Sequence, residues 1–282
     1  MKDAPETSFL AQNEFLLRRL HSLSGIIPVG AYMCVHLSVN SLAFFSPRMY
    51  QLAVNQIHSL GPLLPIVEWA FIFLPLLFHA IYGVIIVRSG QPNSGSYKNQ
   101  SNFRYTLQRA TGMVALLFIF WHVFHMHGWI HTEGWLKTID SLGGGQFKAY
   151  NAVSTASEAM RMSAMVWIIY AVGILSCVYH LANGMWTFGI TWGLWVSPEA
   201  QDRALKACGA FGIVLAVIGM TAWTGFAFTI DTAKAKVEED KIFKSAVSAG
   251  LIDEQEAAHK RAGHEGDHKP ANVAGAADST GS

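Results

Sequence analysis

The sequence predicts an all-α membrane protein with five transmembrane helices, and three observations support this class. Hydrophobic residues make up 51% of the 282 positions and charged residues only 14%, compared with about 25% charged residues in soluble domains. Five apolar stretches are each long enough to cross the hydrocarbon core of a bilayer, which takes about 20 residues. The low share of charged residues points to the lipid bilayer, and the net charge of +1 gives no reason to expect nucleic acid.

The expected elements follow the order of these apolar stretches. Residues 1–22 are predicted to form an N-terminal segment at the cytoplasmic membrane surface, because Arg18 and Arg19 precede the first apolar run. Residues 23–230 then form the five-span domain, and residues 231–282 are predicted to be a flexible polar C-terminal tail with one short helix around residues 238–258. The spans are expected at residues 23–45, 64–87, 103–129, 166–192 and 207–230.

The segments between the spans predict the orientation and the local irregularities. Residues 46–63, 88–102 and 193–206 are expected to be loops, and residues 130–158 a longer polar segment. Pro75 is expected to kink the second span, because proline removes a helix hydrogen bond. Lysine and arginine are more frequent on the side of the N-terminus, which predicts a cytoplasmic N-terminus in the cell's cytoplasmic (inner) membrane.

Each of the first four spans contains one histidine deep within apolar sequence: His36, His79, His122 and His180. An ionisable side chain at such a depth is costly and indicates a functional site. A helix rises about 1.5 Å per residue, and successive spans run in opposite directions. His36 and His122, the outer pair, are therefore expected at one depth. His79 and His180, the inner pair, are expected closer to the cytoplasm.

Two histidine pairs at two depths predict two haem b groups, with two axial imidazoles on each iron and four spans forming the haem-binding bundle. The sequence has no CxxCH motif, so covalent attachment is not expected. Small residues fit this interpretation. Gly83 and Gly184 follow a histidine by four positions, one helical turn away, and Gly25 and Gly112 are expected to pass the inner haem.

The basic residues at the inner surface have two interpretations. Arg18, Arg19, His21 and Arg109 are expected near the cytoplasmic ends of their spans. They serve either as positively charged membrane anchors or as partners of haem propionates through charge-assisted hydrogen bonds. The two roles are compatible, so all four residues are candidate cofactor contacts.

Several polar residues expected near the outer surface also have two interpretations. His125, His127 and His131 follow His122, and the HxxHxH pattern at 122–127 would suit zinc. The favoured interpretation is an interfacial belt at the membrane edge. His58 is expected in a solvated loop, with a quinone contact as the alternative. Glu68 at the outer end of the second span is either a proton relay or a headgroup neighbour.

Six motifs resemble the dihaem cytochrome b membrane anchor of bacterial succinate dehydrogenase, of the type with a single anchor subunit. The order and spacing of these motifs agree over roughly residues 14–230. The motifs are RRLHSLSGIIPVG at 18–30, HLSVN at 36–40, FLPLLFHAIYG at 73–83, LQRATG at 107–112, WHV at 121–123 and HLANG at 180–184.

The resemblance implies a role in electron transfer. It implies that the four deep histidines ligate the two haems, and its first motif adds Ser22 to the cofactor contacts. The expected partners are a flavoprotein subunit with FAD and an iron–sulfur subunit, which would pass electrons from succinate through the haems to a quinone, typically menaquinone. The chain would carry out no succinate chemistry itself. A homo-oligomer of the whole complex is a further expectation.

Three alternatives remain open at this point. A fumarate reductase anchor would have the same fold and would work in the quinol-oxidising direction. A dihaem cytochrome b of a hydrogenase or formate dehydrogenase would have a different ligand spacing. A transporter with buried proton-relay histidines would contain no haem.

Overall fold

The computed structural model describes residues 9–89, 100–130, 132–257 and 260–262, and these residues form helices and no strand. Five helical segments are long and apolar enough to cross a membrane. They are Glu14–Phe45, Leu63–Ser89, Asn102–His127, Ala164–Thr191 and Pro198–Thr229. The predicted fold class, an all-α protein with five spans, is therefore confirmed.

The first span consists of two helices that meet at a proline. After the short α1 (Phe9–Gln12), helix α2 covers Glu14–Ile26 and α3 covers Val29–Phe45. Ile27 is extended (φ −131°, ψ 114°), as expected for a residue before proline. The helical segment begins at Glu14, well before residue 23, because the predicted surface segment that contains Arg18 and Arg19 is itself helical.

The second and third spans each contain a wider π-helical turn. In the second span, α5 (Leu63–Glu68) is followed by η1 (Trp69–Phe73) and α6 (Leu74–Ser89). Since Pro75 would clash with the carbonyl group four residues earlier in a regular helix, the π turn directly before it accommodates the ring. In the third span, α7 (Gln100–His122) continues into η2 (Val123–His127) and ends at the left-handed Gly128 (φ 78°).

The last two spans begin at serine caps. Helix α10 covers Ala164–Thr191, and α11 covers Pro198–Thr224 and continues into η4 (Gly225–Thr229). The hydroxyl of Ser197 accepts a hydrogen bond from the backbone N–H of Ala200, and Pro198 occupies the first helical position. Both features favour a helix start, so α11 begins inside the segment 193–206 that was predicted to be a loop.

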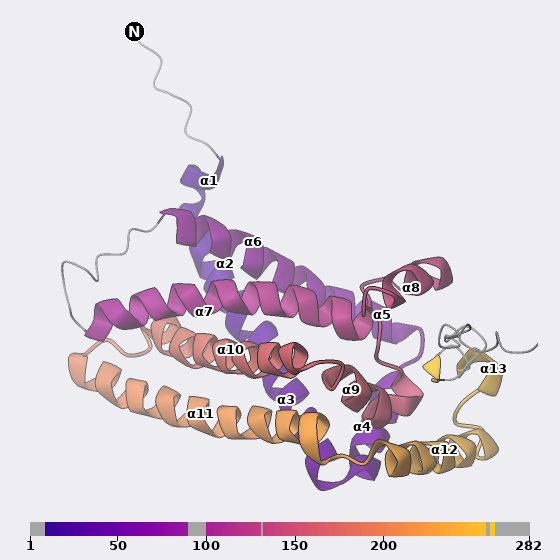
Figure 1. Cartoon of the computed structure of the whole chain (residues 1–282). Coiled ribbons are helices and arrows are strands. Elements are labelled where there is room, and N and C mark those ends of the chain that lie inside the picture. Colours follow the sequence, from indigo (N-terminus) through magenta and orange to yellow (C-terminus); the bar gives the residue numbers. More distant parts are fainter. Residues whose placement is uncertain (1–8, 90–99, 131, 258–259, 263–282) are drawn as a thin grey trace, which may run out of the picture.

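Helix α10 lies between α7 and α11 and also contacts α2, while α11 contacts α3 and α2 contacts α6 (Figure 1). The outer surface of this bundle is apolar. One residue from each span illustrates this, and all five are more than half exposed: Val35, Ile81, Leu117, Val172 and Ile213. Such a continuous apolar surface suits lipid rather than water.

One end of the bundle carries a group of shorter helices (right in Figure 1). These are α4 (Pro47–His58), α8 (Glu133–Asp140), η3 (Ala149–Asn151), α9 (Ala152–Met160), α12 (Thr232–Ser248) and α13 (Glu254–Ala257). We call α4, α9 and α12 the cap. The segments 46–63 and 130–158, predicted to be a loop and a longer polar segment, therefore contain helices.

The first part of the predicted flexible tail, residues 231–282, is also an ordered helix. The carboxylate of Asp231 accepts hydrogen bonds from the N–H groups of Ala233 and Lys234 (both 3.1 Å). This N-cap starts α12 six residues before the expected helix around 238–258. Residues 263–282 of the predicted tail lie outside the described residues.

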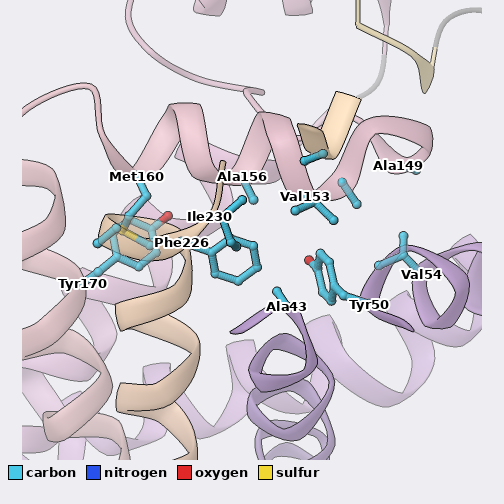
Figure 2. Packing of buried hydrophobic residues seen from close by; sticks show 13 residues of the cluster. Ala43, Tyr50, Val54, Ala149, Val153, Ala156, Met160, Tyr170, Phe226 and Ile230 are labelled. Atoms are coloured by element: carbon cyan, nitrogen blue, oxygen red, sulfur yellow. The ribbon is translucent and has the colours of Figure 1, made fainter. Parts of the chain in front are cut away.

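The cap is joined to the bundle through a shared apolar core (Figure 2). Tyr50 from α4 and Val153 from α9 meet Phe226 from η4, and the cluster extends to Tyr170 on α10. Gln51 of α4 adds polar contacts, because its amide donates to the carbonyl of Ala149 (2.8 Å) and accepts from the N–H of Ala152 (2.9 Å).

A buried carboxylate holds α9 and α12 together. Glu239 of α12 is only 2% exposed. Its two oxygens accept hydrogen bonds from the N–H groups of Val153 (2.7 Å) and Ser154 (2.9 Å), from the Ser154 hydroxyl (2.6 Å) and from the Asn151 amide (3.3 Å). A negative charge at a helix N-terminus is stabilised by the free N–H groups and by the helix dipole, so Glu239 of α12 satisfies the N-terminal N–H groups of α9.

Candidate functional site: two pairs of buried histidines

The four deep histidines lie in two facing pairs. In the outer pair, the ring centroids of His36 on α3 and His122 on α7 are 5.9 Å apart, and the ring planes are inclined by 72°. In the inner pair, His79 on α6 and His180 on α10 have centroids 6.0 Å apart and an interplanar angle of 81°. The structure thus brings together the two pairs that the depth argument predicts.

The spacing within each pair fits two imidazoles on opposite sides of one metal ion. A metal–imidazole nitrogen bond is about 2 Å long, so the two ring centroids of such a pair are about 6 Å apart. Among the described residues, no group of three or more His, Cys, Asp or Glu side chains could hold a metal ion. Two imidazoles on opposite sides of a metal ion leave the positions between them open to further ligands, such as the four nitrogens of a porphyrin.

The inner pair is oriented by main-chain carbonyl groups. Nδ1 of His79 lies 2.9 Å from the carbonyl oxygen of His21, and Nδ1 of His180 lies 3.0 Å from that of Gln108. A carbonyl oxygen can only accept, so both Nδ1 atoms carry the proton and both Nε2 atoms keep a free lone pair. This is the tautomer that metal-binding histidines require, with Nδ1–H held by a second group.

A side-chain clamp ties α7 to α10 at the inner pair. The amide of Gln108 donates to the carbonyl of His180 (3.0 Å), and its oxygen accepts from the amide of Asn183 (2.9 Å). Together with the bond from His180 Nδ1 to the Gln108 carbonyl, these contacts fix the rotation of α10 relative to α7.

The outer pair is held by phenol groups instead. Nδ1 of His122 lies 3.2 Å from the hydroxyl of Tyr170, and Nδ1 of His36 lies 3.5 Å from that of Tyr32. The Tyr170 hydroxyl is also 2.9 Å from Nδ1 of His125. The four histidines thus share one pattern, in which Nδ1 has a partner within the protein.

Glycines on neighbouring helices lie against the inner imidazoles. A Cβ atom on Gly25 would come within 2.7 Å of Nδ1 of His79, and one on Gly112 within 2.7 Å of Cε1 of His180. Both distances are shorter than real Cβ contacts, so a side chain at either position would require the imidazole to shift. A Cβ on Gly83 would instead approach the ring of His21 (3.2 Å), and one on Gly184 the amide of Gln108 (3.4 Å). Gly25 and Gly112 therefore define the space beside the inner pair.

The two pairs lie at different depths of the bundle. Gly112 contacts the inner pair and His122 belongs to the outer pair, and both are on the continuous helix α7. They are ten positions apart, which corresponds to about 15 Å along the helix axis. The two sites are thus separate rather than one shared cavity.

His21 lies directly on the inner pair. Its ring stacks on that of His79, with centroids 4.1 Å apart and planes inclined by 8°. Its carbonyl is the group that accepts from His79 Nδ1. Ser22, next in the chain, accepts a hydrogen bond from the indole N–H of Trp192 (3.0 Å).

The three arginines near the inner pair all contact other protein groups. Arg18 forms an ion pair with Glu14 (2.7 Å), and the guanidinium of Arg19 lies over the ring of Trp192 (5.0 Å). Arg109 donates to the carbonyl of Ile86 (3.4 Å) and also lies over the ring of Tyr105. Propionate contacts would have to add to these partners or replace them.

The interfacial-belt prediction is wrong for His125. This residue is only 3% exposed, and its ring stacks on Trp121 (centroids 4.7 Å apart, 9°). It lies inside the bundle rather than facing the membrane edge, and its Nδ1 is 2.9 Å from the hydroxyl of Tyr170. The ring of His127 lies 5.9 Å from that of Phe73, and His131 lies outside the described residues.

His58 and Glu68, the two other residues expected near the outer surface, are half-buried. His58 belongs to helix α4 rather than a loop, and its Nδ1 lies 3.0 Å from the carbonyl of Val54. Glu68 is the last residue of α5, directly before the π turn η1.

Within the described part of the chain, five helices long enough to cross a membrane and two facing histidine pairs define the class of multi-pass helical membrane proteins. No family model matches the sequence. The chain is 34% identical over 213 residues to the "Succinate dehydrogenase cytochrome b558 subunit" of Bacillus subtilis (strain 168). The matched region covers 76% of this chain and 97% of the relative.

The chain therefore belongs to the family of succinate dehydrogenase cytochrome b membrane subunits. The resemblance seen in the sequence is thereby confirmed. Neither a fumarate reductase anchor, nor a hydrogenase or formate dehydrogenase cytochrome, nor a haem-free transporter gains support from this relative.

Proposed function

We propose that the chain is the membrane-anchoring, electron-transfer subunit of a succinate dehydrogenase. In this proposal it receives electrons from an iron–sulfur subunit and delivers them through two haem b groups to a quinone, with menaquinone as the expected acceptor. The observation that carries the proposal is the presence of two facing imidazole pairs at two depths of one bundle. The relative's name, a cytochrome b558, supports it.

The residues that would hold the cofactors are the two histidine pairs. His79 and His180 would ligate one haem, and His36 and His122 the other. Each imidazole would bind through Nε2, because Nδ1 already has a partner in the protein. A bound haem iron takes up and releases one electron at a time.

The surroundings of the inner pair fit a flat group. Gly25 and Gly112 expose backbone where any side chain would meet an imidazole, and Gly83 and Gly184 add small residues one helical turn after the two histidines. The residues Arg18, Arg19, His21, Ser22 and Arg109 lie on the same side of the bundle and are the proposed donors to the haem propionates.

The separation of the two pairs suits transfer across the membrane. The hydrocarbon core is about 30 Å thick, and the two sites differ by about 15 Å along α7. The apolar helices that surround them exclude water, and the carbonyl and phenol partners of Nδ1 hold the imidazoles in one orientation. Each site is thereby preorganised, so little rearrangement is needed when its charge changes.

The proposed location is the cytoplasmic membrane, with the N-terminus in the cytoplasm. A flavoprotein subunit with FAD and an iron–sulfur subunit would dock on that side, close to the inner pair. Succinate oxidation itself would take place in the flavoprotein, because this chain is proposed only to transfer electrons.

The proposal is tested by affinity purification of the tagged chain from detergent-solubilised membranes. A flavin-containing subunit and an iron–sulfur subunit should co-purify, and the preparation should reduce a menaquinone analogue with succinate. A matched preparation of the His180→Ala variant should keep the partner subunits but lose most of the quinone reduction. Purification without these partners, or unchanged quinone reduction in the variant, would contradict the proposal.

A further inference from the structure

The hydroxyl of Tyr170 lies between two histidines of the third span. It is 3.2 Å from Nδ1 of His122 and 2.9 Å from Nδ1 of His125. Tyr170 reaches this position from α10 and is only 4% exposed. Its ring is nearly perpendicular to that of His122 (84°, centroids 5.5 Å apart) and packs in the core that joins the bundle to the cap.

The direction of these two hydrogen bonds follows from counting protons. An imidazole that binds a metal through Nε2 carries its proton on Nδ1, so His122 must donate to the Tyr170 oxygen. The phenol has a single proton, which it can then give to Nδ1 of His125. If both histidines donated to the phenol, its own proton would have no acceptor among the described residues, which is costly in a buried site.

The favoured array therefore runs from His122 Nδ1–H to Tyr170 Oη–H to His125 Nδ1. It places the proton of His125 on Nε2, which is buried and has no partner among the described residues. The alternative would leave two groups without partners, the phenol proton and Nε2 of His125. The array with fewer unsatisfied groups is the more stable one.

We propose that Tyr170 is a positioning residue for the outer pair, which accepts the Nδ1–H of His122 and sets the orientation and the donor strength of this imidazole. His125 completes the array by fixing the direction of the hydroxyl proton. This inference rests on the proposed function, because it takes His122 to be a ligand of the outer haem iron.

The consequence is a reduction potential that depends on one side chain. Hydrogen bonding at Nδ1–H makes an imidazole a stronger donor, which favours the oxidised metal and lowers its potential. A phenol that also donates to His125 is a better acceptor than an isolated phenol, because linked hydrogen bonds strengthen one another. The inner ligands use main-chain carbonyls instead, so side-chain tuning of this kind is confined to the outer site.

The test is a redox titration of the purified, whole complex with Tyr170→Phe. Phenylalanine keeps the ring in the apolar core and removes only the hydroxyl. One of the two haem components should shift to higher potential with an altered low-spin electron paramagnetic resonance signal, while the other component stays unchanged. The shifted component should be the one that is lost in His122→Ala.

Two further variants complete the experiment. Tyr50→Phe is the matched control, since Tyr50 is buried in the same core and its hydroxyl binds Asn40 (3.3 Å) rather than a histidine. It should leave both potentials unchanged. His125→Leu should move the same component as Tyr170→Phe, in the same direction and by less, because the phenol keeps its oxygen but loses its acceptor.

Unchanged potentials and spectra in both Tyr170→Phe and His125→Leu, with two haems bound, would overturn this inference and leave the proposed function intact. An equal shift of both components would also overturn it. A wild-type complex without haem would overturn the proposed function and this inference together.

Discussion

The inner and outer histidine pairs have nearly the same ring spacing but are held by different parts of the protein. The inner imidazoles bind the carbonyls of His21 and Gln108, whereas the outer ones face the phenols of Tyr32 and Tyr170. The inner site is thus defined by backbone and glycines, and the outer site by side chains next to the cap. We expect the outer site to respond more readily to single substitutions.

Removal of a proposed haem ligand is the strongest test of two separate sites. His180→Ala should reduce the haem content from two to one per chain by emptying the inner site, and His122→Ala should do the same at the outer site. Haem quantitation on purified variants measures both effects. If both variants lost the same redox component, the separation of the two sites would be contradicted.

Filling the space at Gly112 should have the next largest effect. A leucine at this position would overlap the ring of His180, so Gly112→Leu should lose the inner haem and keep the outer one. Gly209→Leu is the matched control, because a Cβ there meets nothing within 4 Å. An inner haem bound at full occupancy in Gly112→Leu would show that the glycine is dispensable.

Weakening the contact between α9 and α12 in the cap should affect the outer pair alone. Glu239→Ala leaves buried donors of Asn151, Val153 and Ser154 without their acceptor, at about 1–3 kcal/mol for each unpaired group. Limited proteolysis should cut near α12 faster, and only the outer component should change in potential or line shape.

The neighbouring Glu238 provides the control for this experiment. Its ion pair with Arg48 is accessible to solvent, with side chains 32% and 60% exposed, so Glu238→Ala should cost less than about 1 kcal/mol. Equal protease sensitivity of the two variants would mean that burial of Glu239 does not hold the cap.

The smallest redox effect is expected from Gln108→Leu. This change removes the hydrogen bonds from Gln108 to Asn183 and to the His180 carbonyl. The amide of Asn183 is then buried without its partner, which should lower the free energy of unfolding by about 1–3 kcal/mol. The main-chain carbonyl that accepts from His180 Nδ1 remains. The inner potential should therefore move less than the outer potential does in Tyr170→Phe, and a larger inner shift would reverse the comparison.

The sequence was sufficient to predict the spans and the pairing of the histidines. A helix has a constant rise, so the positions of His36, His79, His122 and His180 within their apolar runs determine their relative depths. The start of α4 carried a recognisable signal that was missed. Ser46 and Pro47 form a standard helix start, although the segment was predicted to be a loop.

Other features depend on contacts between distant parts of the chain. Glu239 lies in a run of charged residues that indicates a solvated helix face, yet α9 buries it from more than 80 positions away. His125 and Tyr170 are 45 positions apart, and no local pattern connects them. Side chains that find a polar partner on another helix cannot be identified from periodicity or composition.

The central claim is that the four deep histidines bind two haems, and a reduced-minus-oxidised spectrum with haem quantitation on the purified chain tests it most directly. Two haem b per chain, reduced in two separate steps, are expected. A colourless protein, or a haem content of two that is unaffected by replacing any of the four histidines, would contradict it.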